Sequence, residues 1–167
     1  SSYRNLTLEP GRVYSVAVVP FFNLSARRNA GEILALHFLR HLSALPQFRV
    51  ADTGATRQQL LNARIIMDSG LSISDADTVA ALIEAEFVLA GRVLRYEDFE
   101  GPGGTPGVEF STALIEKRTR RVVWSSDSYN DGSDGVGFFA RGTSKTAHVM
   151  ATQMVRRTAE LIAGRRD

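Results

Sequence analysis

The pattern of apolar and polar positions first picks out a buried strand near the start of the chain. No polar residue occurs from Val16 to Phe22, and the run is rich in β-branched side chains. Such a run is typical of a strand that is covered on both faces of its sheet. Pro20 has no N–H for the strand ladder, so it can stand only at the end of the strand. The sequence therefore predicts a central strand within residues 12–22.

A helix is predicted directly after this strand, from Ala30 to Leu45. Its apolar positions recur at helical spacing and are Leu34, Phe38, Leu42 and Leu45. Asn29 and Glu32 have the spacing of a capping box at its start, and Pro46 ends it. Ile33 and Leu36 fall outside the main apolar stripe, which makes them candidates for a second contact surface.

The remaining pattern predicts seven more elements. They are a short strand at 48–52, helices at 53–65 and from Ser74 (capped with Asp77) to Ala85, three strands of an antiparallel meander within 86–129, and a last helix at about 144–163. The resulting order is β-α-β-α-α-β-β-β-α. We therefore expect an α/β fold with a mixed sheet of about five strands flanked by helices. Residues 1–11 are expected to be a flexible segment, and 12–164 a single α/β domain.

Composition narrows the classes of partner. Twenty Lys and Arg against 18 Asp and Glu leave a net charge of only +2, so we expect no nucleic-acid partner. There is no cysteine, which excludes disulfides and thiolate sites within the chain. No apolar run approaches the roughly 18 residues of a membrane span. The polar start SSYRNLTLEPG is what we expect if a leader or an anchor has been removed upstream.

The loop NLSARRNAG, which joins the first strand to the first helix, stands where α/β proteins often bind phosphate. A phosphate cradle needs glycines in the loop, whereas Gly31, the only glycine, lies inside the predicted helix. Arg27 and Arg28 remain a candidate anion site at the helix N-terminus. The favoured alternative is a loop that satisfies its own backbone through Asn23, Ser25 and Asn29.

A second glycine-containing stretch, GFFARGTSK at 137–145, has the glycine spacing of a P-loop. Thr143 occupies the position of the required lysine, so nucleotide binding is not favoured. Two adjacent phenylalanines beside an arginine are more typical of a docking surface. We therefore expect Phe138, Phe139 and Arg141, together with Ile33 and Leu36, to contribute to a partner or subunit contact.

No catalytic or metal-binding constellation stands out. His37 and His41 are four residues apart on one helix, but no acidic general base lies between them, and His148 is on another helix. There is no G-x-S-x-G elbow. We expect no catalytic residues, no metal and no cofactor, and therefore a protein that is not an enzyme.

Three stretches together resemble a known superfamily. They are VAVVPFFNLS, residues Ala85 to Val93, and the strand pair from Leu114 to Trp124. They are similar to the "AVLPF-N-S", "V-G-V" and "L-D-x-x-T-x-x-x-x-W" patterns of the TolB N-terminal/CsgG-like superfamily of bacterial envelope proteins. Within it, the chain looks most like small uncharacterised lipoproteins of Gram-negative bacteria.

That resemblance implies a periplasmic domain tethered by a lipidated cysteine upstream of Ser1, at the outer membrane. It also implies a homo-oligomer that contacts other envelope proteins. The resulting hypothesis is a non-enzymatic accessory in envelope assembly or export. The alternative is a periplasmic ligand-binding or sensory module that uses Arg27 and Arg28 to hold an anionic small molecule.

Overall fold

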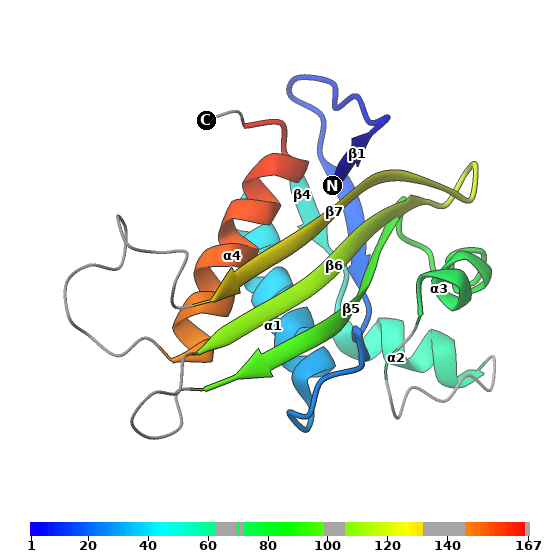
Figure 1. The fold of residues 1–167 in the computed structure, drawn as a ribbon. Helices are drawn as coiled ribbons and strands as arrows, with labels where there is room; N and C mark the ends of the chain where they lie inside the picture. Colours follow the sequence, from blue (N-terminus) through cyan, green and yellow to red (C-terminus); the bar gives the residue numbers. More distant parts are fainter. Residues whose placement is uncertain (63–69, 71, 99–105, 132–145, 166–167) are drawn as a thin grey trace.

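The computed structural model describes residues 1–62, 70, 72–98, 106–131 and 146–165. In chain order its elements are β1 (Ser2–Arg4), β2 (Tyr14–Val18), β3 (Phe22–Asn23), α1 (Ala30–Ser43), β4 (Phe48–Val50), α2 (Thr53–Asn62), α3 (Ile73–Ala80), β5 (Phe87–Glu97), β6 (Gly107–Glu116), β7 (Arg121–Asp131) and α4 (Ala147–Ile162). Figure 1 shows the arrangement of these elements. None of the described helices is long and apolar enough to cross a bilayer.

The strands form one mixed sheet in the order β1-β7-β6-β5-β2-β4, with β3 beside β5. Strands β4, β2 and β5 run parallel, whereas β5, β6, β7 and β1 run antiparallel. The predicted α/β class, the mixed sheet and the antiparallel meander are confirmed. The additional strands β1 and β3 are short and carry no distinctive apolar pattern.

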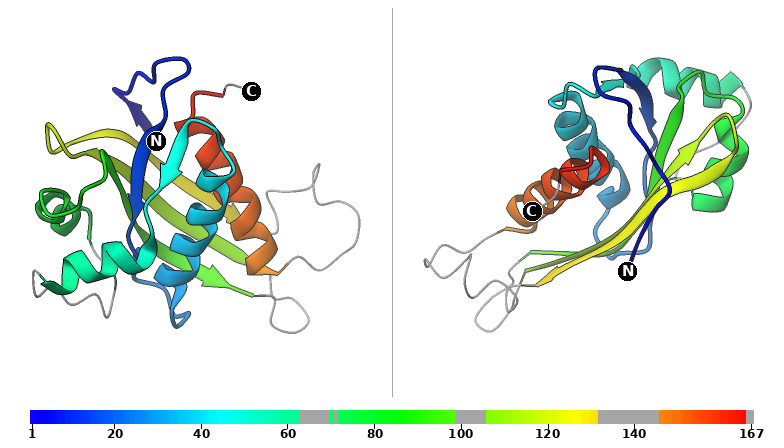
Figure 2. Two further views of the ribbon diagram at one scale, coloured as in Figure 1. Left: turned by 180° about the vertical axis from the view of Figure 1, so that it is seen from behind. Right: turned by 90° about the horizontal axis from the view of Figure 1, so that it is seen from above.

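Helices cover both faces of the sheet, as Figure 2 shows. Val16 and Val18 of β2 belong to a core shared with α1 and α4. Ala17 and Val19 belong to a second core, shared with α2 and α3. Because successive strand residues point to opposite faces, an uninterrupted apolar run was needed to fill both cores. The predicted doubly covered strand is confirmed, and it ends at Val18, before Pro20.

Gly31 joins the first strand to the first helix by close backbone approach. The Phe21 N–H donates to the Gly31 carbonyl oxygen at 3.1 Å. A Cβ on Gly31 would overlap the carbonyl oxygen of Phe21. The glycine of this loop therefore lies inside α1, as predicted, and permits packing of the helix against the chain after β2.

Two predicted helix caps are wrong. Asn29 precedes α1 in the left-handed region with φ 61°, and its side chain makes no capping hydrogen bond. Asparagine tolerates this conformation better than most residues, and the conformation does not place its side chain as a capping box requires. Helix α3 is capped two residues earlier than predicted, because the Ser72 hydroxyl accepts from the Asp75 N–H at 3.1 Å.

The N-terminal segment begins as a strand at the edge of the sheet. Asp127 N–H donates to the Ser1 carbonyl oxygen at 3.1 Å, and Asn5 N–H donates to Val123 at 2.7 Å. The Arg4 guanidinium donates to two carbonyl oxygens at the end of α4, those of Leu161 and Ile162. The flexibility expected for residues 1–11 and the single domain expected for 12–164 stay predictions.

Candidate functional site

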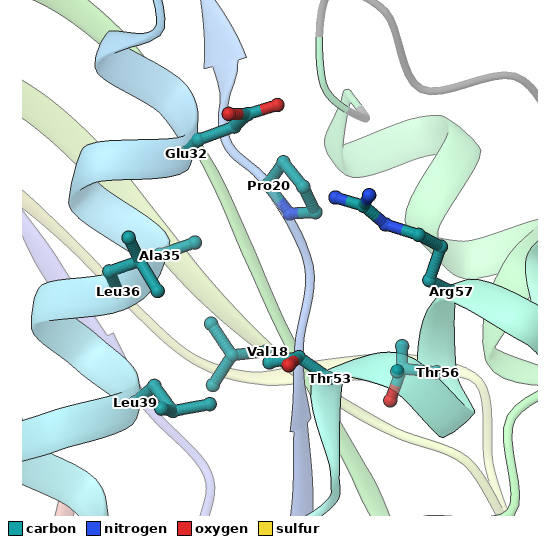
Figure 3. Close-up of a pocket in the computed structure, with 10 residues that line it drawn as sticks. Val18, Pro20, Glu32, Ala35, Leu36, Leu39, Thr53, Thr56 and Arg57 are labelled. Carbon is teal, nitrogen blue, oxygen red and sulfur yellow. The ribbon is translucent and has the colours of Figure 1, made fainter.

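A cleft lies between α1 and α2, and we call it the α1/α2 cleft. It encloses about 380 Å³. Its floor is Val18 and Pro20, at the carboxyl end of β2. Its walls are Glu32, Ala35, Leu36 and Leu39 of α1 and Thr53, Gly54, Thr56 and Arg57 of α2. Figure 3 shows these residues on both sides of the β2 strand end.

A smaller hollow of about 250 Å³ lies on the other side of Leu36, and we call it the Arg27 hollow. It is lined by Arg27, Ile33, Leu36, His37, Tyr96, Asp98 and His148. Leu36 lines both hollows and is 61% exposed. The structure therefore brings together three sequence-predicted candidates, Arg27, Ile33 and Leu36, around one surface.

Arg27 is engaged with neighbouring side chains. Its guanidinium donates to Asp98 Oδ2 at 3.2 Å and lies 5.9 Å from the centre of the Tyr96 ring. The loop also satisfies its own backbone, because Asn23 Nδ2 donates to the Arg27 carbonyl oxygen at 2.7 Å. Arg28 is exposed. Anion binding at Arg27 and Arg28 stays a prediction, and the ion pair with Asp98 competes with it.

Asp98 has a structural role that the sequence did not reveal. Its Oδ1 accepts a hydrogen bond from the Ala147 N–H at 2.8 Å, at the first turn of α4. The spacing of 49 residues between the two partners gives no local signal, so only the fold brings them together.

The three histidines lie together between α1 and α4. Thr152 Oγ1 lies 3.1 Å from His41 Nε2 and 3.3 Å from His37 Nδ1. The centres of the His37 and His148 rings are 4.8 Å apart. Burial, with added repulsion from His148, His41 and Arg40, lowers the pKa of His37 to about 4. His37 is therefore neutral at neutral pH, and its Nε2 has no hydrogen-bond partner among the described residues.

The three histidines form a small cluster between the two helices. Within the described parts of the chain, no group of three His, Cys, Asp or Glu side chains is placed to hold a metal ion. In this cluster the His148 ring lies against the His37 ring. The sequence did not predict this contact, because it depends on how α1 and α4 pack.

The predicted contact residues divide into two sets. Leu36 is exposed and Ile33 is half-buried, and both face the Arg27 hollow. Phe138, Phe139 and Arg141 lie outside the described residues. The contact role of all five residues stays a prediction.

The arrangement defines a class of protein: a mixed α/β sheet covered on both faces, with a cleft at the ends of its parallel strands. No family model and no curated protein matches the chain. The chain is similar in structure to a subunit of a PelC dodecamer from Paraburkholderia phytofirmans. The two share 21% identity at a TM-score of 0.61 over 94% of this chain and 92% of that one.

Two further structures have the same fold. Lipoprotein GNA1162 from Neisseria meningitidis shares 14% identity at a TM-score of 0.59, over 91% of this chain and 99% of that one. The LpoB C-terminal domain from Escherichia coli shares 14% identity at a TM-score of 0.52, over 70% and 82%. At these identities the likeness establishes the fold. The TolB N-terminal/CsgG-like resemblance stays a prediction.

Proposed function

We propose that the chain is a non-enzymatic periplasmic lipoprotein domain that acts as an accessory in envelope assembly or export, by self-association and contact with other envelope proteins. The observation that carries this proposal is the fold, which extends over nearly the whole chain in both a PelC dodecamer and a lipoprotein. In this proposal a lipidated cysteine upstream of Ser1 tethers the domain to the outer membrane.

The chemistry of the described residues supports a binding role. Among them, no histidine is hydrogen-bonded to a carboxylate, so they offer no His-carboxylate pair to activate a nucleophile. An exposed leucine between two hollows is instead suited to insert into, or receive, a neighbouring surface. Leu36 and Ile33 therefore form the proposed subunit contact, joined by Phe138, Phe139 and Arg141.

Sedimentation velocity tests the self-association. We expect the wild-type domain to sediment as an oligomer and Leu36→Ser to shift it towards the monomer at the same concentration. Leu61→Ser is the matched control, because Leu61 is also an exposed helical leucine, 53% accessible, but lies on α2. A wild-type domain that stays monomeric at high concentration would contradict the proposal, as would equal effects of the two variants.

Membrane attachment is tested on the full gene product in a Gram-negative host. We expect incorporation of an alkyne-labelled fatty acid and recovery in the outer-membrane fraction, both lost when the lipobox cysteine is replaced by serine. Recovery of an unlabelled protein in the soluble periplasmic fraction would contradict the tether.

A further inference from the structure

The α1/α2 cleft lies at the carboxyl end of β2, where the connections after β2 and β4 diverge. β2 and β4 are parallel neighbours, and the chain leaves them towards opposite faces. After β2 it enters α1, which packs into the core on one face, and after β4 it enters α2, which packs into the core on the other. Such a divergence leaves a crevice beyond the carboxyl ends of the strands, the usual ligand position in open α/β sheets.

The cleft has an apolar side and a polar side. Val18 and Pro20 form the floor, and Ala35, Leu36 and Leu39 line the α1 side. On the α2 side, the lining is Thr53, Gly54, Thr56 and Arg57. A volume of about 380 Å³ is within the range of small-ligand pockets. An occupant must therefore combine apolar groups with hydrogen-bonding groups.

Opposite charges stand on the two walls. Figure 3 shows the Arg57 guanidinium extending from α2 towards Pro20, and the Glu32 carboxylate extending from α1. Neither side chain takes part in an ion pair with another described residue. Both are exposed, so each is available to a charged group of a ligand.

The cationic group of this cleft is the Arg57 side chain and not the start of α2, because that helix end is already capped. Asp52 Oδ1 accepts from the Ala55 N–H at 2.9 Å, and the Asp52 carbonyl oxygen accepts from Thr56 at 3.0 Å. The Asp52 carboxylate also opposes a second anion at this helix end. A guanidinium, by contrast, binds a carboxylate through two parallel hydrogen bonds.

We propose that the α1/α2 cleft binds a short zwitterionic peptide with apolar side chains. Its carboxylate pairs with Arg57, its ammonium group pairs with Glu32, and its side chains lie on Val18, Pro20 and Leu39. The threonine hydroxyls on the α2 side offer hydrogen bonds to its amide groups. A simple anion would leave Glu32 without a partner, and a purely apolar ligand would leave both charges unused.

The probe is the dipeptide Leu-Leu, titrated by NMR and by calorimetry into the wild-type domain. We expect saturable binding, with shifted amide signals at Val18, Leu36 and Thr56. N-acetyl-Leu-Leu lacks the ammonium group and Leu-Leu-amide lacks the carboxylate. Each is expected to bind about tenfold more weakly, because each loses one charge-assisted interaction.

Protein variants assign each end of the peptide. We expect Arg57→Gln to weaken Leu-Leu about tenfold and to leave the already weak Leu-Leu-amide unchanged, whereas Glu32→Gln leaves N-acetyl-Leu-Leu unchanged. Arg49→Gln, which removes an exposed arginine of β4 outside the cleft, is the matched control and should bind like the wild type. All three substitutions are at exposed positions, so circular dichroism should show a native fold.

Three results would overturn the proposal: no saturation at millimolar peptide, equal affinity for the three peptides, or equal affinity of Arg57→Gln and the wild type. The inference goes beyond the proposed envelope role and does not depend on it. A monomeric domain that binds Leu-Leu would contradict only the proposed function. An oligomer that does not bind it would contradict only the peptide site.

Discussion

At the scale of single residues, the least expected environment is that of His37. It is only 7% exposed and lies between α1 and α4 in contact with His148 and Thr152. The i,i+4 spacing of His37 and His41 was visible in the sequence. Their surroundings were not visible, because Thr152 and His148 come from the far end of the chain.

Acid is expected to destabilise the fold through His37. Its pKa is about 4 in the folded protein against 6.5 for a free histidine, so the unfolded chain binds the proton more readily. The contribution of neutral His37 is therefore complete above pH 6.5 and is lost as the pH falls towards 4. A shift of this size corresponds to a loss on the order of 3 kcal/mol. Urea unfolding of the wild type at pH 7.5, 6 and 5 follows the loss, which should reach about 2 kcal/mol at pH 5.

His37→Asn isolates this contribution. Asparagine does not titrate, so the free energy of unfolding of the variant should change less between pH 6.5 and 5 than that of the wild type. The groups that face His37 (His148, His41 and Arg40) remain in the variant, so the difference between the two slopes belongs to His37. Parallel pH profiles would show that His37 does not carry the effect.

At the scale of elements, long periodic segments were predictable and short or interrupted ones were not. The apolar residues of β2 are continuous and those of α1 recur at helical spacing, so each element can be recognised from its own residues. β1 has the sequence SYR and no buried residue, so it is a strand only because β7 provides hydrogen bonds to it. Local pattern does not reveal such a strand.

The ends of helices are also difficult to predict from local sequence. The stretch Ser72 to Asp77 contains two Ser-x-x-Asp spacings, and the sequence does not distinguish between them. The structure uses Ser72, whose hydroxyl also donates to Asp75 Oδ2 at 2.6 Å. Helix α4 has a local cap, since the Thr146 hydroxyl accepts from the Val149 N–H at 3.2 Å. A second acceptor at the start of α4 is Asp98, 49 residues away, which no local capping pattern includes.

Asp98→Ala should therefore destabilise the protein through α4. It removes the acceptor for the Ala147 N–H, a loss comparable to that of a helix cap, so we expect a decrease of about 1 kcal/mol in the free energy of unfolding. The ion pair with Arg27 adds little, because both side chains are more than two-fifths exposed. Chemical denaturation at pH 7.5 measures the change.

Glu97→Ala is the control for this substitution. Glu97 is the preceding acid and pairs with Arg95 at 2.9 Å, but it is 54% exposed, so its loss should change stability by less than about 0.5 kcal/mol. Asp98→Asn retains an acceptor oxygen and should recover part of the stability. Equal effects of Glu97→Ala and Asp98→Ala on stability would show that Asp98 does not cap α4.

At the scale of the whole molecule, the candidate sites follow from the topology. The α1/α2 cleft exists because the chain leaves β2 and β4 towards opposite faces. The predicted order of elements already placed one helix after each of these two strands. The pairing of β2 between β4 and β5 was not predictable, and neither was the position of Arg57 opposite Glu32. The sequence therefore identified Leu36 of α1 as a candidate, whereas Arg57, which lines the same cleft from α2, was missed.

The two helical layers differ in how much they bury. On one face, α1 and α4 contribute buried residues along their whole lengths, including Leu34, Phe38, Met150 and Val155. On the other face, α2 buries only Thr56 and Leu60 along its 10 residues. Segments that bury little apolar surface open at lower free energy than the rest of the fold.

Hydrogen exchange should therefore separate the two layers. We expect amides in the middle of α2 to be protected at least about tenfold less than those in the middle of α1 and α4, because α2 can open while the larger core stays intact. Mass spectrometry of peptides covering residues 53–62, 30–43 and 147–162 measures this, with β2 as a protected reference. Saturating Leu-Leu should slow exchange in α2 and leave α4 unchanged, since α2 lines the cleft and no described residue of α4 does. Equal protection of the three helices in the free protein would mean that the sheet and both layers unfold as one unit.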